Sequence, residues 1–259
     1  MILDYKGVSV FYSDEGKGSA VVLLHGFLEN SSMWEMFVPQ LIKKNRVICI
    51  DLLGHGSTGC IGYVHTMEDM ADAVRAVLKH LKIKKSTIIG HSLGGYVALA
   101  FAEKEPDALK GLCLMNSTTR ADTPERIEIR NRGIEAAKGN YKTIVRLSIA
   151  NLFRPKSRAL FKEEIKRVKN EALKTPLQGY IAAQEGMKMR PDREALLHFS
   201  PYKKMMVIGK KDPVLNYELM LNQAEGTEIE LVVFPDGHMS HIENGKDLLK
   251  KIMHFIEKK

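Results

Sequence analysis

The sequence predicts an α/β fold with a mostly parallel, doubly wound sheet that is interrupted by an inserted helical segment. Short apolar runs rich in β-branched residues alternate with helix-like stretches in the first part of the chain, which is the pattern of parallel strands joined by helices. This alternation stops near residue 120 and resumes near residue 200. A length of 259 residues with 44% hydrophobic composition suits one domain with an insertion.

Six apolar runs are expected to be strands, and three longer stretches to be helices. The strands are 21–24, 47–50, 86–89, 112–115, 205–208 and 229–234. Apolar residues at helical spacing predict helices over 67–81 and 93–102, and an amphipathic helix over 248–256 closes the chain.

The segment between the two groups of strands shows only helical periodicity. A segment that interrupts a parallel sheet after its fourth strand is expected to lie over the carboxyl ends of the strands, where ligands bind. We therefore predict an α/β core of residues 1–119 and 200–259 and a helical cap of residues 120–199.

The net charge of +8 is concentrated in the predicted cap. Residues 120–199 hold 18 Lys and Arg against 10 Asp and Glu, whereas the rest of the chain holds 21 of each. Solvated helix faces explain such an excess, and so does attraction of an acidic substrate or an anionic surface. No compact basic and aromatic motif accompanies the charge, so nucleic acid is not expected as a partner.

Cysteine usage and hydropathy favour a cytoplasmic protein. The three cysteines cannot all pair with one another, and Cys49 and Cys113 lie in strand-like runs where a thiol packs as a small apolar group. The amino-terminal residues resemble neither a signal peptide nor an anchor. No segment approaches the roughly 20 apolar residues of a membrane span. Oligomeric state is left open.

Ser92 is the candidate nucleophile. It lies between an apolar strand and a helix in the motif Gly90-His91-Ser92-Leu93-Gly94. A strand that turns at once into a helix strains the residue at the apex and brings its neighbours against other backbone, where only glycine fits. The hydroxyl then lies at a helix N-terminus, which favours the negative charge that forms on attack. Capping of the helix by Ser92 is the alternative role.

A serine nucleophile needs a base, and the base needs an acid to orient it. In enzymes with this elbow, the acid follows the serine along the chain and the histidine follows the acid. Asp212 follows the strand 205–208, and His238 follows the strand 229–234. His238 is therefore expected to take the proton of Ser92 and return it to the leaving group, while Asp212 holds the imidazole in the required tautomer.

Nearby residues offer alternatives for these roles. His241 lies on the same loop as His238 and is a second candidate base, but Gly237 favours a sharp loop at His238. Asp236 is a second candidate for the orienting acid, although it is close in sequence to the histidine. His91 is expected to point away from the apex as a packing or hydrogen-bonding residue.

The oxyanion hole is predicted from two backbone N–H groups. One belongs to Leu93, directly after the nucleophile, and the other to Phe27 in the loop after the first clear strand. His25 in that loop is expected to stiffen it without taking part in the chemistry.

Five motifs in order resemble the landmarks of the α/β-hydrolase superfamily over nearly the whole chain. They are His25-Gly26-Phe27, Asp51-Leu52-Leu53-Gly54-His55-Gly56-Ser57, Gly90-His91-Ser92-Leu93-Gly94-Gly95, Gly209-Lys210-Lys211-Asp212-Pro213 and Gly237-His238 followed by Glu243. The resemblance implies a helical lid, no cofactor, no metal, and hydrolysis of an ester or related bond through an acyl-enzyme. It also implies that Asp51 and His55 are structural.

Two positions separate the chain from other members of the superfamily. Epoxide hydrolases and haloalkane dehalogenases carry an aspartate at the elbow, where this chain has Ser92. Epoxide hydrolases usually carry a proline in the His-Gly loop, where this chain has Leu28. Both chemistries are therefore disfavoured.

The favoured function is a carboxylesterase acting on small or medium acyl esters as small-molecule substrates. The same triad also serves cleavage of a carbon–carbon bond or thioester, or a lyase reaction, on an acidic metabolite, for which the basic cap is the only support. A ligand sensor that retains the triad is a third hypothesis. No motif in the cap identifies substrate-binding residues.

Overall fold

The computed structural model describes residues 1–258, and within them eight strands form one sheet. The strand order is β1-β2-β4-β3-β5-β6-β7-β8. The strands are β1 (Ile2–Tyr5), β2 (Val8–Gly16), β3 (Ser19–Leu24), β4 (Asn45–Ile50), β5 (Ser86–His91), β6 (Leu109–Met115), β7 (Lys203–Gly209) and β8 (Glu230–Phe234). From β4 to β8 all neighbours are parallel, which confirms the predicted fold class.

The antiparallel edge formed by β1 and β2 was not among the predicted strands. Lys6 and Gly7 connect the two strands with φ of 53° and 80°, the backbone of a tight hairpin turn. Val10 and Tyr12 of β2 are buried, while alternate positions are more exposed. This two-residue alternation is typical of a strand and could have predicted β2. The alternation stops at the polar run Ser13–Gly16, so the sequence there does not look like a strand.

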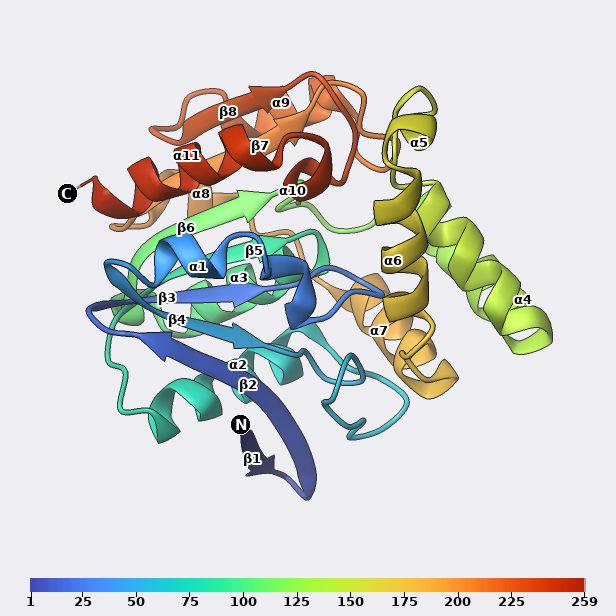
Figure 1. Cartoon of the computed structure of the whole chain (residues 1–259), viewed down its shortest axis with the longest axis horizontal. Coiled ribbons are helices and arrows are strands. Elements are labelled where there is room, and N and C mark those ends of the chain that lie inside the picture. Colours follow the sequence, from blue (N-terminus) through green and yellow to red (C-terminus); the bar gives the residue numbers. More distant parts are fainter. Residues whose placement is uncertain (259) are drawn as a thin grey trace.

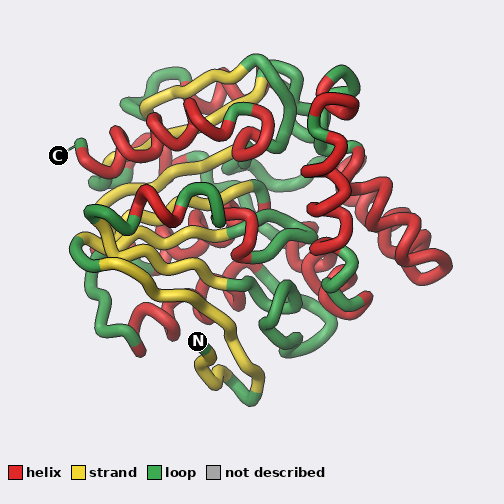
Figure 2. Tube along the Cα trace, in the orientation of Figure 1, coloured by secondary structure: helices red, strands yellow, loops and turns green. Residues whose placement is uncertain are grey.

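Successive residues of the central strands bury their side chains in two separate cores, because strand side chains alternate between the faces. Val22 of β3 packs with α2 (Met67–His80) and α3 (Leu93–Lys104), as do residues of α8 (Ala195–Phe199) and α9 (Tyr217–Ala224). Val21 packs on the other face with α1 (Val38–Leu41) and α11 (Gly245–Glu257). Helices therefore cover both faces of the sheet (Figure 2).

The three predicted helices form, and each has at least one end that differs by one to three residues from the prediction. Helix α2 begins at Met67 because Thr66 and Asp69 form a reciprocal capping box. The carboxyl-terminal helix begins at Gly245, three residues before the predicted start, and is preceded by the short α10 (Ser240–Glu243).

The predicted cap segment holds five helices, of which α8 packs with the sheet core and the other four lie beyond the carboxyl ends of the parallel strands (Figure 1). These four are α4 (Pro124–Ala150), α5 (Ser157–Leu160), α6 (Lys162–Ala172) and α7 (Leu177–Met189). Helix α4 is kinked at Asn140, whose φ of −147° is not helical. A third apolar cluster joins these helices to Leu28 and Met239 on loops of the sheet. Within residues 1–258, no helix has the length and apolar character needed to cross a membrane.

Candidate active site

Ser92 lies at a sharp turn between β5 and α3. Its φ of 49° and ψ of −113° are strained for a residue with a side chain. The flanking glycines permit this turn: a Cβ on Gly90 would lie 2.3 Å from the carbonyl oxygen of Gly94, and one on Gly94 would lie 2.5 Å from that of Leu24. The apex is therefore held against β3 and carries Ser92 at the first turn of α3.

The structure brings Ser92, His238 and Asp212 into one hydrogen-bonded series. His238 Nε2 lies 2.9 Å from Ser92 Oγ, and His238 Nδ1 lies 2.7 Å from Asp212 Oδ2. Each residue comes from a different loop at the carboxyl edge of the sheet, after β5, β7 and β8. Since a carboxylate accepts, Nδ1 carries a proton, which leaves Nε2 free to accept the proton of the serine.

Asp212 is held as a carboxylate. Its Oδ1 accepts hydrogen bonds from the backbone N–H groups of Val214 at 2.8 Å and Leu215 at 3.0 Å. Burial raises the pKa of Asp212, but attraction to His238 and these hydrogen bonds outweigh burial and bring the pKa below its ordinary value. The acid is therefore charged at neutral pH.

Asn116, which the sequence analysis did not single out, supports the same acid. Its Nδ2 donates to Asp212 Oδ2 at 3.2 Å and to the carbonyl oxygen of Gly237 at 3.3 Å. Asn116 directly follows β6 and has a φ of 46°, a conformation that asparagine tolerates better than most residues. Its position after a strand, at the carboxyl edge of the sheet, could have marked Asn116 as a candidate site residue. That position does not identify its partner, Asp212, which is 96 residues away in the chain.

The two predicted oxyanion donors are the N–H groups of Phe27, in the loop after β3, and of Leu93, directly after Ser92. Phe27 lines the same cavity as Ser92, and Leu93 begins α3. Among residues 1–258, no backbone acceptor binds the N–H of Phe27 or that of Leu93. Neither N–H group would therefore have to give up a backbone partner in order to bind an oxyanion.

The alternative base and acid make other contacts. His241 Nε2 faces Glu29 Oε1 at 3.6 Å, while the nearby His238 is the histidine that contacts Ser92. Asp236 Oδ1 lies 3.2 Å from Arg154 Nη1, so its carboxylate is directed to the helical segment.

Ser92 and His238 open into a cavity of about 160 Å³ between the sheet loops and the helical segment. The sheet side and α3 contribute Phe27, Leu28, Glu29, His91, Ser92, Tyr96, Val214 and His238. The helical segment contributes Arg126, Arg130, Ser148, Ile149, Leu152, Gln184 and Met187. A larger hollow of about 800 Å³ near α6 and α11 has no residue of the predicted triad in its lining.

The sequence also matches a family of known proteins. The family model for the alpha/beta hydrolase fold matches residues 19–245. The chain belongs to this family. Its solved relatives include an esterase from Thermogutta terrifontis, determined with malate bound, that is 32% identical with a TM-score of 0.90 and covers 96% of this chain and 93% of that chain.

Two further relatives of this α/β hydrolase are similar over most of its length. A carboxylesterase structure from the thaumarchaeon Nitrososphaera gargenis is 28% identical with a TM-score of 0.88, covering 98% of this chain and 97% of that chain. The dihydrolipoyllysine-residue acetyltransferase component of the acetoin cleaving system of Pseudomonas putida is 28% identical over 258 residues. That match covers 93% of this chain and 64% of the relative. The chain spans less than two thirds of the length of the first curated relatives that it matches.

In this α/β hydrolase, Asp51 and His25 make contacts that fix loops. Asp51 accepts from the backbone N–H groups of Ser31 at 2.7 Å and Ser57 at 2.8 Å. His25 Nε2 accepts from the N–H of Leu52 at 2.9 Å. Burial lowers the pKa of His25, so its imidazole stays neutral and able to accept.

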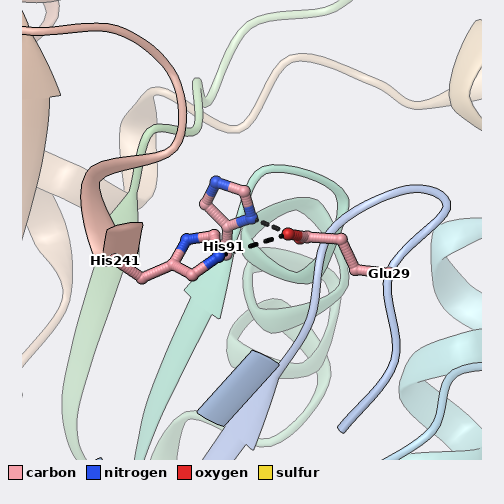
Figure 3. Close-up of side chains that lie close together, drawn as sticks. All are labelled: Glu29, His91 and His241. Atoms are coloured by element: carbon pink, nitrogen blue, oxygen red, sulfur yellow. Dashed lines mark hydrogen bonds and ion pairs between the residues drawn. The ribbon is translucent and has the colours of Figure 1, made fainter. Parts of the chain in front are cut away.

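A second buried carboxylate, that of Glu29, lies against His91 and His241 (Figure 3). Glu29 Oε2 is 2.7 Å from His91 Nδ1 and accepts from the N–H of Gly26 at 2.8 Å. His241 faces the other oxygen of the same carboxylate. Burial raises the pKa of Glu29, but attraction to His91 outweighs it and lowers the pKa to about 2. His91 therefore hydrogen-bonds as predicted, although it also lines the cavity.

Glu29, His91 and His241 are residue types that bind metals, and their ligand atoms lie within 4.8 Å of one another. However, Glu29 Oε2 already faces two donors, and His91 Nε2 faces the carbonyl oxygen of His238 at 3.0 Å. These hydrogen bonds occupy one carboxylate oxygen of Glu29 and both ring nitrogens of His91. The geometry therefore fits an ion pair better than a metal centre.

Proposed function

We propose that this α/β hydrolase cleaves small or medium carboxylic esters through an acyl-enzyme on Ser92. The observation that carries the proposal is the series in which His238 lies 2.9 Å from Ser92 Oγ and 2.7 Å from Asp212. This distance suits direct proton transfer from a serine to an imidazole. Similarity to an esterase and to a carboxylesterase structure supports the same class of reaction.

In the first half of the reaction, Ser92 Oγ attacks the ester carbonyl carbon while its proton passes to His238 Nε2. The carbonyl oxygen becomes an oxyanion between the N–H groups of Phe27 and Leu93. As the tetrahedral intermediate collapses, the bond to the alcohol oxygen breaks and His238 gives that oxygen its proton. An acyl-enzyme and a free alcohol result.

In the second half, water attacks the acyl carbon and gives a proton to His238. The bond to Ser92 Oγ then breaks, the proton returns to Oγ, and the carboxylic acid leaves. Asp212 stays ionised throughout and stabilises the imidazolium that forms in each half. Solvent reaches the site because the side chain of Ser92 is only partly buried.

Hydrolysis of p-nitrophenyl acetate and butyrate by the wild-type chain and by Ser92→Ala tests the proposal. We expect turnover by the wild type and a loss of at least about 10³-fold in kcat for Ser92→Ala. Ser9→Ala, which changes an exposed serine of β2, is the matched control and should retain full activity. Absence of turnover, or equal turnover by Ser92→Ala, would show the proposal to be wrong. Ligand binding without turnover would favour the sensor hypothesis.

A further inference from the structure

On the helical side of the cavity, arginines outnumber the carboxylates that neutralise them. Three arginines, Arg126, Arg130 and Arg190, lie around a single carboxylate, that of Asp122. Asp122 Oδ2 is 2.5 Å from Arg130 Nε, and Asp122 Oδ1 is 2.8 Å from Arg190 Nη2. Both of these ion pairs are almost completely buried. The Asp122 carboxylate therefore already forms ion pairs with two guanidinium groups.

The two paired arginines make further contacts within the chain, although Arg190 Nε is buried without a hydrogen-bond partner. Arg130 Nη1 donates to Gln184 Oε1 at 2.8 Å. Arg190 Nη1 donates to the carbonyl oxygen of Met187 at 2.8 Å, and its guanidinium lies 4.1 Å from the centre of the Tyr96 ring. Packing between the helical segment and α3 thus accounts for Arg130 and Arg190.

Arg126 has no such partner. Within residues 1–258, no carboxylate lies within 4.0 Å of its guanidinium, and its side chain makes no hydrogen bond. The side chain is half-buried and lines the cavity that also holds Ser92 and His238. Burial, together with repulsion from Arg130, lowers the pKa of Arg126. A guanidinium nevertheless stays charged in proteins, so the site keeps an unmatched cation.

The local structure of α4 does not explain a cation at this position. Arg126 lies in the first turn of the helix, where Thr123 accepts a hydrogen bond from its backbone N–H. The helix dipole at an N-terminus disfavours a cation and favours an anion. An anion bound in the cavity next to the Arg126 side chain would offset this unfavourable placement of the cation.

We propose that the substrate is an ester that carries a carboxylate, such as a half-ester of a dicarboxylic acid, and that Arg126 binds this carboxylate. The inference rests on the proposed ester hydrolysis and adds the class of substrate. The planar guanidinium offers paired N–H donors that match the two oxygens of a carboxylate. Ile149, Leu152, Met187 and Val214 supply apolar lining, which suits an aliphatic spacer between the carboxylate and the ester.

Matched pairs of esters with equal acyl chain length test this proposal. Ethyl butyrate is compared with monoethyl succinate, and ethyl hexanoate with monoethyl adipate, by chromatography of the released acids. For the wild type we expect kcat/KM to be about 10-fold or more higher for the half-ester in at least one pair, the scale of a charge-assisted hydrogen bond.

Variants at Arg126 then test whether this residue causes the preference for half-esters. Arg126→Gln is expected to lower kcat/KM for the preferred half-ester about 10- to 100-fold more than for its neutral partner. Arg126→Lys should restore part of the preference, and Arg126→Glu should reverse it. Arg132→Gln removes an exposed arginine of the same helix, which lies 3.7 Å from Glu128, and should change neither rate.

The outcomes separate this inference from the proposed function. Turnover of neutral esters with no preference for half-esters in the wild type, or a preference that survives Arg126→Gln, would overturn the inference and leave ester hydrolysis standing. If no ester is turned over, the proposed function fails, and calorimetric titration with succinate and adipate tests the carboxylate site by itself. Binding by the wild type that Arg126→Gln abolishes would support the site, and equal or absent binding would overturn it.

Discussion

Nε2 of His91 lies 3.0 Å from the backbone carbonyl oxygen of His238, which joins the strand before the nucleophile to the loop that carries the predicted base. His91 Nδ1 faces the Glu29 carboxylate at 2.7 Å. Both partners are acceptors, so His91 must donate from both nitrogens and is an imidazolium. Burial lowers the pKa of His91, but the attraction of Glu29 and these hydrogen bonds outweigh burial and raise it.

Replacing Glu29 with Gln is therefore expected to disturb the position of His238. Loss of the carboxylate lets His91 become neutral, and one of its two hydrogen bonds loses its donor proton. We expect kcat for ester hydrolysis to fall about 10-fold with a smaller change in KM, and the pH–rate profile to shift because the charge next to His238 is lost. Glu128→Gln, at an exposed position of α4, is the control. An unchanged pH profile in Glu29→Gln would contradict a positioning role.

The same substitution should reduce stability in a pH-dependent way. Removing one partner of a buried ion pair costs about 3 kcal/mol at neutral pH. The pKa of Glu29 is lowered from 4.5 to about 2, so its contribution is present above pH 4.5 and is lost as pH falls from 4.5 toward 2. Urea unfolding should show a wild-type advantage at pH 7 that shrinks across this window. A constant difference would disprove the coupling.

His241 is expected to make the chain sensitive to mild acid. Burial lowers its pKa to about 3; Glu29 opposes this lowering, while His91, His238 and Arg167 add to it. The unfolded chain binds this proton near pH 6.5, whereas the folded chain binds it only near pH 3. The free energy of unfolding therefore falls as pH decreases between these values, by about 1.4 kcal/mol per pH unit for this group.

The measurement compares urea unfolding of the wild type and His241→Asn at several pH values from 7 to 4. The free energy of unfolding of the variant should depend less steeply on pH. The difference in slope should correspond to about one bound proton, because the variant lacks the group that titrates only in the unfolded chain over this range. Parallel curves for the two proteins would count against a neutral His241 in the folded state.

Asn116 is expected to act through Asp212. Asn116→Ala removes the donor to Asp212 Oδ2 and to the carbonyl oxygen of Gly237. We expect kcat to fall about 10-fold with KM nearly unchanged, as for the loss of one hydrogen bond to a charged group. Steady-state kinetics on p-nitrophenyl butyrate measure this effect. If KM rises while kcat is kept, Asn116 supports the binding of substrate and not the orientation of the acid.

The chain order of strands and loops was sufficient to predict most of the fold and the three residues of the series. Ser92, Asp212 and His238 each follow a recognisable strand, and the carboxyl ends of parallel strands meet at one edge. Local sequence patterns were therefore enough to predict that these three residues, which are far apart in the chain, lie close together.

Other parts of the site depend on contacts that local patterns do not encode. Glu29 and His91 are 62 residues apart, and neither follows a motif that names the other. The excess positive charge of residues 120–199 is evident from the sequence. Which arginine could bind a substrate depends on which arginines are already paired with Asp122, and only the structure shows this. The fold of the helical segment places Arg126 in the cavity, where it has no ion-pair partner among residues 1–258.

Mass spectrometry after reaction with an alkyl p-nitrophenyl phosphonate tests whether Ser92 forms a covalent intermediate. We expect one phosphonyl adduct per chain, located on the peptide that contains Ser92. The adduct should be absent in Ser92→Ala and slow to form in His238→Ala, while Ser9→Ala reacts like the wild type. An adduct on another residue, or ester turnover without any adduct on Ser92, would contradict the account.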